Sequence, residues 1–190
     1  MKTIITLALA ALAAGQAQAA PIALDKAVIT ATYNQQASGV LGNDQNFQAV
    51  AGSNTTRLDP TDSGVEFLTA DALFAVDFSR SGLLTIYNND MPAIDGDYTL
   101  TFDFGSSLAA QITSFTLLDG SMVDGVPGLS VLNSHSIALD LSRLAWNGYY
   151  TAITAQIGAA DAAAVPEPAS AALLLLGAAG LAMSRRTRRA

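Results

Sequence analysis

The sequence predicts an all-β protein whose body is a single β-sandwich domain of jelly-roll type. Several segments alternate apolar and polar residues, most clearly residues 97–104 with the sequence DYTLTFDF. Such alternation is typical of an antiparallel strand with one buried face. Clusters rich in Gly, Asn and Asp separate these segments and indicate turns. No stretch between residues 20 and 158 shows the 3.6-residue period of a long helix.

Eight or nine short strands are expected, a number typical of sandwiches and jelly rolls. The strongest alternation lies at residues 74–78, 97–104 and 136–142. Weaker strands are expected at residues 26–33, 65–68, 83–87, 112–118, 129–132 and 149–157. Residues 42–44 are among the expected turns, and residues 159–164 (AADAAA) are expected to form a short linker after a domain that covers residues 20–158.

The N-terminus has the three parts of a signal peptide, assigned here to residues 1–19. Lys2 supplies a positive start, residues 4–14 are apolar, and Ala17 and Ala19 stand at positions −3 and −1 of a cut after Ala19. An eleven-residue helix is about 16 Å long, too short for a stable membrane span. Export through the Sec translocon and removal of this segment are therefore expected.

The C-terminus combines a proline motif, an apolar helix and a basic end within residues 165–189. The motif, residues 165–170, contains Val165, Pro166, Glu167 and Pro168, and its prolines oppose helix formation. The apolar residues 169–183 predict a single transmembrane helix of about 22 Å, short for a hydrocarbon core of about 30 Å. The basic residues that follow predict a cytoplasmic end under the positive-inside rule. They are Arg185, Arg186, Arg188 and Arg189.

This tail resembles the PEP-CTERM sorting domain, also called "ice-binding protein C-terminal domain". The resemblance implies that an exosortase, a membrane-embedded protease, recognises Pro166, Glu167 and Pro168, while the arginines hold the chain before cleavage. It also implies a Gram-negative bacterium and a transient anchor in the cytoplasmic membrane. A final place at the cell surface or in the extracellular matrix of a biofilm follows from the same resemblance. The body shows no regular Thr-x-Thr array of the kind that a flat ice-binding face needs.

Composition excludes several classes of function. Residues 20–164 hold four cationic and fifteen acidic residues, a net charge of −11, which argues against nucleic-acid binding. The chain has no cysteine, which excludes thiolate catalysis and cysteine-ligated zinc, and only one histidine, His135.

Three aromatic residues surround a predicted Asn-Gly turn and form a candidate carbohydrate-binding site. Trp146, Tyr149 and Tyr150 would stack on sugar rings if they were exposed on one sheet. Burial in the core is the favoured alternative, because Tyr149 shares the strand phase of Ile153 and Ile157.

Asp90, Asp95 and Asp97, with Asn88 and Asn89 nearby, form a candidate calcium site because Ca²⁺ prefers carboxylate and amide oxygens. The spacing of an EF-hand is absent, and turns are rich in Asp and Asn for local reasons. A weaker candidate comprises Asp119 and Asp124.

No catalytic signature is present, and the body is expected not to be an enzyme. Ser134 and Ser136 flank His135, but no Gly-x-Ser-x-Gly turn occurs. Glu66 is the only glutamate between residues 20 and 164, and pairing it freely with aspartates identifies no glycosidase site. No cofactor is expected apart from the Ca²⁺ considered above. The body is thus expected to be a non-catalytic binding or structural module, and the resemblance of the tail implies a link to exopolysaccharide. The alternatives are a calcium-stabilised adhesin-like domain and a secreted hydrolase.

Overall fold

The computed structural model describes residues 19–59 and 64–160. The predictions made for Ala17, for the sorting motif 165–170, for the transmembrane helix 169–183 and for the basic residues 185–189 lie outside these residues. Within the described ranges, no helix combines the length and the apolar character needed to cross a membrane.

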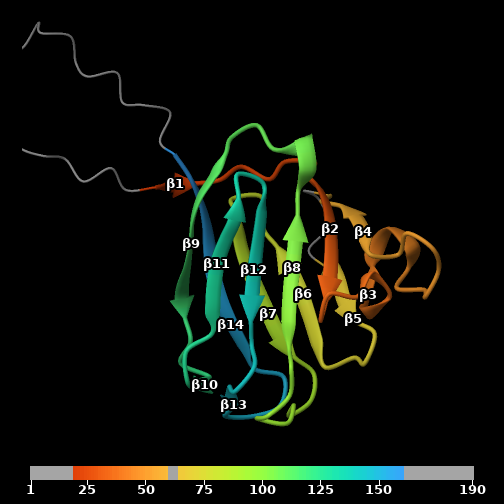
Figure 1. Ribbon diagram of the computed structural model, residues 1–190, viewed down its shortest axis with the longest axis vertical. Coiled ribbons are helices and arrows are strands. Elements are labelled where there is room, and N and C mark those ends of the chain that lie inside the picture. Colours follow the sequence, from red (N-terminus) through yellow and green to blue (C-terminus); the bar gives the residue numbers. More distant parts are fainter. Residues whose placement is uncertain (1–18, 60–63, 161–190) are drawn as a thin grey trace, which may run out of the picture.

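The body consists of two main antiparallel sheets packed face to face (Figure 1). The first has the order β1-β14-β7-β6-β5-β3, with β9 also paired to β14, and the second has the order β11-β12-β8-β2-β4. A separate two-stranded sheet joins β10 to β13. The strands are β1 (Ala20–Pro21), β2 (Val28–Tyr33), β3 (Val40–Gly42), β4 (Thr55–Arg57), β5 (Phe67–Thr69), β6 (Phe74–Phe78), β7 (Leu83–Asn88), β8 (Thr99–Asp103), β9 (Ile112–Asp119), β10 (Val123–Asp124), β11 (Gly128–Asn133), β12 (Ser136–Asp140), β13 (Ala145–Trp146) and β14 (Ala152–Ala159). Three 3-10 helices complete the fold, namely η1 (Ala37–Gly39), η2 (Asn43–Gln45) and η3 (Gly105–Ser107).

Aromatic side chains from both sheets meet in the core between them. The ring of Phe102 on β8 lies 5.0 Å from that of Phe78 on β6 and 6.2 Å from that of Phe67 on β5. All three side chains are at most 2 % exposed. Because β8 belongs to one sheet and β5 and β6 to the other, these contacts bind the two layers together. The prediction of an all-β sandwich is confirmed, whereas the jelly-roll assignment stays a prediction.

Strands with strict and with weak alternation were both located closely, since β7 and β9 each end one residue beyond the predicted 83–87 and 112–118. Strand β6 has the predicted bounds, Phe74–Phe78, and β8 is shorter than the predicted 97–104. Strand β3 lies partly in a segment expected to turn, and η2 follows it. The sequence did not predict β1, β4, β10 or β13 either. These strands of two or three residues are too short to show a period, so only their sheet partners reveal them.

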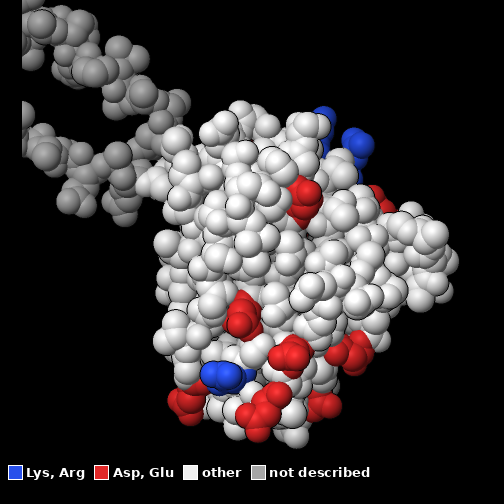
Figure 2. Space-filling model, in the orientation of Figure 1, with Lys and Arg blue, Asp and Glu red and all other residues white. Residues whose placement is uncertain are grey.

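Both ends of the described chain leave the sandwich at the same edge (Figure 1). Ala20 pairs with Ala159, and Pro21 pairs with Gly158. Strand β14 therefore includes Ala159, the first residue of the predicted linker, and it also pairs with β7 and β9. The loops that follow β7 and β13 lie at the opposite end, where most acidic residues of the visible face gather (Figure 2).

Candidate functional site

A hollow of about 240 Å³ opens on the outer face of the first sheet. Two tyrosines line it, Tyr87 from β7 and Tyr150 from the turn before β14. The remaining lining residues are Val65, Ala75, Asn88 and Asn89. Pockets that enclose whole small molecules have volumes of about 300–1,000 Å³. This hollow therefore suits one ring of a larger ligand, not an enclosed small molecule.

The predicted aromatic trio is divided between core and surface. Trp146 is 4 % exposed and packs on Phe74 with their rings 6.0 Å apart, so it is unavailable for stacking on a ligand. Tyr149 and Tyr150 are 64 % and 78 % exposed. The favoured interpretation of the trio as core is confirmed for Trp146 and wrong for both tyrosines.

The strand phase misled the prediction for Tyr149 because the strand starts later than expected. Strand β14 begins at Ala152, and Tyr150 has φ of 57°, in the left-handed region. A left-handed residue ends the alternation of an extended strand. Tyr149 thus loses the inward direction of Ile153 and Ile157, which are at most 1 % exposed.

Asn88 fixes the turn that carries the two tyrosines. Its side chain is fully buried, and its amide donates to the carbonyl oxygens of Gly148 at 2.9 Å and Asp90 at 3.1 Å. Its carboxamide oxygen accepts hydrogen bonds from the N–H and the hydroxyl of Thr151. Asn88 thereby holds the residues on either side of Tyr149 and Tyr150, a role that sequence reasoning missed because it considered Asn88 as a calcium ligand.

An apolar row leads across the sheet to this hollow. Leu41 on β3 lies opposite Leu68 on β5, Leu68 opposite Ala75, Ala75 opposite Tyr87, and Tyr87 opposite Ala152. Ala75 and Ala152 are small, so no large side chain of the neighbouring strands flanks the Tyr87 ring in this row. Tyr87 and Tyr150 also have hydroxyl groups without a partner in the described part of the chain.

The loop after β7 does not bring the three candidate aspartates together in the described part of the chain. Within residues 19–59 and 64–160, no three His, Cys, Asp or Glu side chains are grouped so that they could hold a metal ion. Asp90 instead accepts a hydrogen bond from the N–H of Met91 at 2.7 Å. This local contact at the turn accounts for an aspartate here without any ligand, and the structure does not gather Asp90, Asp95 and Asp97.

Of the second pair of aspartates, Asp119 serves a turn and Asp124 lies in strand β10. Asp119 accepts a hydrogen bond from the N–H of Ser121 at 2.9 Å. Hydrogen bonds from the backbone and hydroxyl of Ser121 lower the pKa of Asp119. A hydrogen-bonded, solvent-facing carboxylate of this kind is a turn former.

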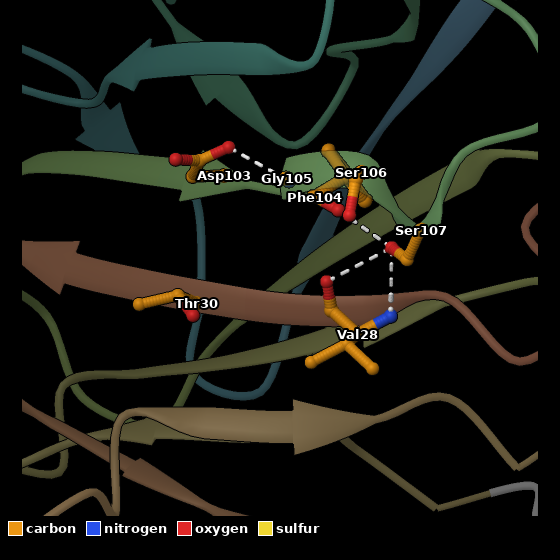
Figure 3. Close-up of a pocket in the computed structure, with 7 residues that line it drawn as sticks. All are labelled: Val28, Thr30, Asp103, Phe104, Gly105, Ser106 and Ser107. Carbon is orange, nitrogen blue, oxygen red and sulfur yellow. Dashed lines mark hydrogen bonds between the residues drawn. The ribbon is translucent and has the colours of Figure 1, made fainter.

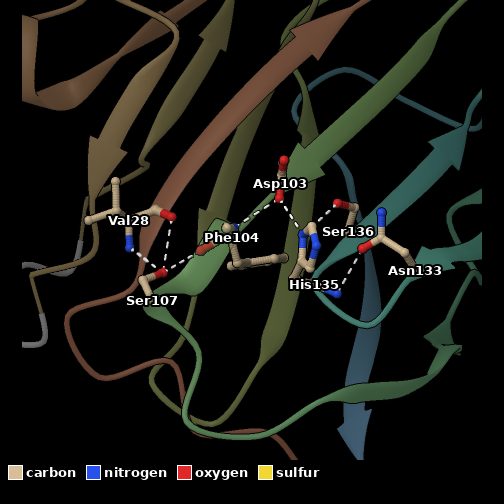
Figure 4. A network of polar contacts seen from close by, with 8 residues as sticks. Val28, Asp103, Phe104, Ser107, Asn133, His135 and Ser136 are labelled. Atoms are coloured by element: carbon tan, nitrogen blue, oxygen red, sulfur yellow. Dashed lines mark hydrogen bonds and ion pairs between the residues drawn. The ribbon is translucent and has the colours of Figure 1, made fainter.

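His135 belongs to a polar network without the geometry of a catalytic triad (Figure 4). Its Nδ1 lies 2.8 Å from Asp103 Oδ1 and 3.2 Å from Ser136 Oγ. A triad requires the carboxylate on Nδ1 and the nucleophile on Nε2. Here both partners share Nδ1, and Ser136 is only 5 % exposed. Glu66, the other candidate acid, is 3 % exposed and accepts the N–H of Phe78 at 2.7 Å.

Threonines of two neighbouring strands lie together on the outer face of the second sheet. Thr30 and Thr32 on β2 lie beside Thr101 and Asp103 on β8, with Thr32 opposite Thr101 and Thr30 opposite Asp103. The sequence alone does not show this grouping, because each strand supplies only one Thr-x-Thr pair. Pairing of β2 with β8 brings the two pairs together.

Comparison with known proteins identifies the C-terminal tail. No curated protein and no solved structure matches the chain. A match to a family model covers residues 164–189, which lie beyond the described body. The chain therefore carries a PEP-CTERM protein-sorting motif at its C-terminus.

Proposed function

We propose that this chain is an exosortase-processed matrix protein whose body binds extracellular polysaccharide without catalysis. The sorting motif implies an exported, exosortase-sorted protein associated with the membrane or cell surface. In the proposed route the chain crosses the inner membrane through the Sec translocon. Residues 169–183 anchor it in the cytoplasmic membrane until the exosortase cuts, after which the body remains at the cell surface or in a biofilm matrix.

The observation that carries the binding proposal is the hollow between Tyr87 and Tyr150. Aromatic rings provide a rigid apolar surface at low entropic cost, which suits the apolar face of a pyranose ring. The row from Leu41 to Ala152 extends this surface across five strands. An extended polysaccharide lying across the strands would therefore contact the sheet beyond the hollow itself.

The position of the hollow relative to the tail favours this function. Ala152 lies beside Tyr87, and Ala159, at the other end of the same strand, leads to the tail. Seven steps along an extended strand cover about 23 Å. The anchored body would thus present the hollow away from its membrane attachment.

Co-sedimentation tests the proposal. The full chain, in a detergent without a sugar headgroup, is mixed with a β-1,4-glucan, a β-1,3-glucan, a galactomannan and alginate. We expect binding to at least one polysaccharide, and an affinity about tenfold lower for Tyr87→Ala or Tyr150→Ala, equivalent to about 1.4 kcal/mol. Tyr149→Ala is the matched control, since Tyr149 is exposed beside Tyr150 without lining the hollow. Absence of binding by the unaltered chain to all four polymers would refute the proposal.

A further inference from the structure

A polar row crosses the outer face of the second sheet, on the side of the sandwich opposite the tyrosine hollow. Ser136 on β12 lies opposite Asp103 on β8, Asp103 opposite Thr30 on β2, and Thr30 opposite Thr55 on β4. Neighbouring strands are about 4.8 Å apart. Three adjacent strands, β8, β2 and β4, therefore present hydroxyl or carboxylate groups along one line perpendicular to the strands, and the buried Ser136 continues the line on β12.

The outward side chains of three strands of this face, β2, β8 and β12, are short, and β4 adds the longer Arg57 opposite Val28. The outward positions of β2, β8 and β12 carry Val28, Thr30, Thr32, Thr99, Thr101, Asp103, Ser136, Ala138 and Asp140. None is Lys, Arg, Gln or Glu, the long residues that lose most rotamer freedom on binding. A branched threonine is restricted at χ1 even before a ligand arrives. An ordinary solvated sheet face is also polar, but this one is in addition preorganised for hydrogen bonding to a flat ligand.

A hollow of about 260 Å³ lies on this row (Figure 3). Thr30, Asp103 and Ser106 line it together with the loop that carries η3. Ser107 ties that loop to β2, because its hydroxyl lies 3.0 Å from the Val28 nitrogen and 3.2 Å from the Val28 oxygen. The rim of the hollow is thus held in place without a ligand.

Asp103 supplies a fixed carboxylate at this hollow. Its Oδ1 accepts the N–H of Gly105 at 2.9 Å and lies 2.8 Å from His135 Nδ1, and Oδ2 takes part in neither contact (Figures 3 and 4). Burial alone would raise the pKa of Asp103, but the hydrogen bonds from Gly105, His135 and Ser136 outweigh it and lower the pKa. The carboxylate is therefore ionised at neutral pH and accepts hydrogen bonds.

The neighbouring threonines add donors. Thr30 Oγ1 lies 3.0 Å from Thr55 Oγ1, and one hydroxyl proton is used between them. The second hydroxyl proton stays available to a ligand. Together with Asp103, the pair offers a charged acceptor and a donor on neighbouring strands, which is the complement of a sugar hydroxyl edge.

We propose that this face, the Asp103 face, is a second binding surface for a neutral polysaccharide and contacts the hydroxyl edges of its sugar rings. The inference rests on the proposed function and extends it. A net charge of −11 in residues 20–164 disfavours a polyanionic polymer. Because the Asp103 face and the tyrosine hollow lie on opposite sides of the sandwich, one body would bridge two polysaccharide chains.

The test removes each surface separately. Thr30→Val with Asp103→Asn removes the Thr30 hydroxyl and the negative charge of Asp103 from the Asp103 face, and Tyr150→Ala weakens the hollow. Thr154→Val, on the outer face of the first sheet, is the matched control. A second double variant, Thr30→Val with Thr55→Val, leaves the Asp103 contacts intact. It is used in place of the first double variant if the melting curve shows that the first one does not fold. The full chain and its variants are mixed with the same four polysaccharides, and binding and turbidity are measured.

We expect the unaltered chain to bind a neutral polymer and to cross-link it into a turbid suspension. Each single-surface variant should keep binding but lose the turbidity, and the combined variant should lose binding at least tenfold further. Full binding and turbidity in the Asp103-face variants would overturn this inference while the tyrosine hollow stands. Preferential binding of the unaltered chain to alginate would overturn the assignment of a neutral polysaccharide. Failure of the unaltered chain to bind any of the four polymers would overturn both proposals.

Discussion

The carboxamide oxygen of Asn88 accepts two hydrogen bonds from Thr151, one from its backbone N–H at 2.7 Å and one from its hydroxyl at 2.8 Å. These residues close the turn that exposes Tyr149 and Tyr150. The side-chain amide of Asn88 meanwhile donates to Gly148 at 2.9 Å, before the tyrosines. A fully buried side chain thus determines the conformation of the most exposed aromatic residues of the body.

Replacing Asn88 by alanine should destabilise the body and disorder the turn. The change leaves the N–H of Thr151 without its partner and removes one of the two hydrogen bonds to the carbonyl of Gly148, and we expect a loss of about 3 kcal/mol in the free energy of unfolding. Urea denaturation measures it. Asn89→Ala is the control, because Asn89 donates one side-chain hydrogen bond, to Ala72 at 3.1 Å, and should lose less than about 1 kcal/mol. Equal losses in both variants would contradict the role of Asn88.

Tyr150→Gly should separate binding from stability. The residue has φ of 57°, a conformation that costs a tyrosine about 1 kcal/mol and a glycine little. Glycine also increases the entropy of the unfolded chain, so the two effects offset each other. We expect a free energy of unfolding within about 1 kcal/mol of the unaltered protein, with polysaccharide affinity reduced as in Tyr150→Ala. A large fall in stability would show that the Tyr150 ring contributes to packing.

Asp77→Asn should make the stability of the body less sensitive to pH. Burial on β6 raises the pKa of Asp77 above the value of 3.8 for an exposed carboxyl. At a pH below 3.8 the carboxyl is protonated in both the folded and the unfolded state, so its burial does not lower the free energy of unfolding through ionisation. As the pH rises through the interval to the folded pKa, the unfolded state ionises first and the protein loses stability.

The asparagine variant carries no such titration, so it should be more stable than the parent at pH 7 and similar to it near pH 3. Thermal melts at both pH values check this. Asp124→Asn, at an exposed position, is the control and should change neither melt appreciably. If the stability gained over the parent were smaller at pH 7 than at pH 3, the predicted direction of the pH effect would be contradicted.

Trp146→Phe should cost little compared with Trp146→Ala. The indole Nε1 is buried and has no hydrogen-bond partner among the described residues, so the tryptophan already bears a desolvation cost of about 1–3 kcal/mol. Phenylalanine removes that cost and keeps contact with Phe74. We expect a loss below about 1.5 kcal/mol for phenylalanine and about 3–5 kcal/mol for alanine, measured by urea denaturation. Similar losses would indicate that the N–H makes a favourable contact.

Sequence alone was sufficient where the signal is local. Strand β6 was located with its bounds, because strict alternation is a property of consecutive residues. The sorting tail was identified from residues 165–189 for the same reason, since its motif, apolar segment and arginines follow one another directly.

Tertiary structure decided everything that depends on partners distant in sequence. Thr30 lies beside Asp103, and Thr32 beside Thr101, only because β2 pairs with β8. The exposure of Tyr150 depends on a turn held by Asn88, a contact that no alternation pattern encodes. Alternation determines which face of a strand is apolar, whereas the sheet partners and the hydrogen bonds of the turns determine which polar and aromatic side chains share one surface.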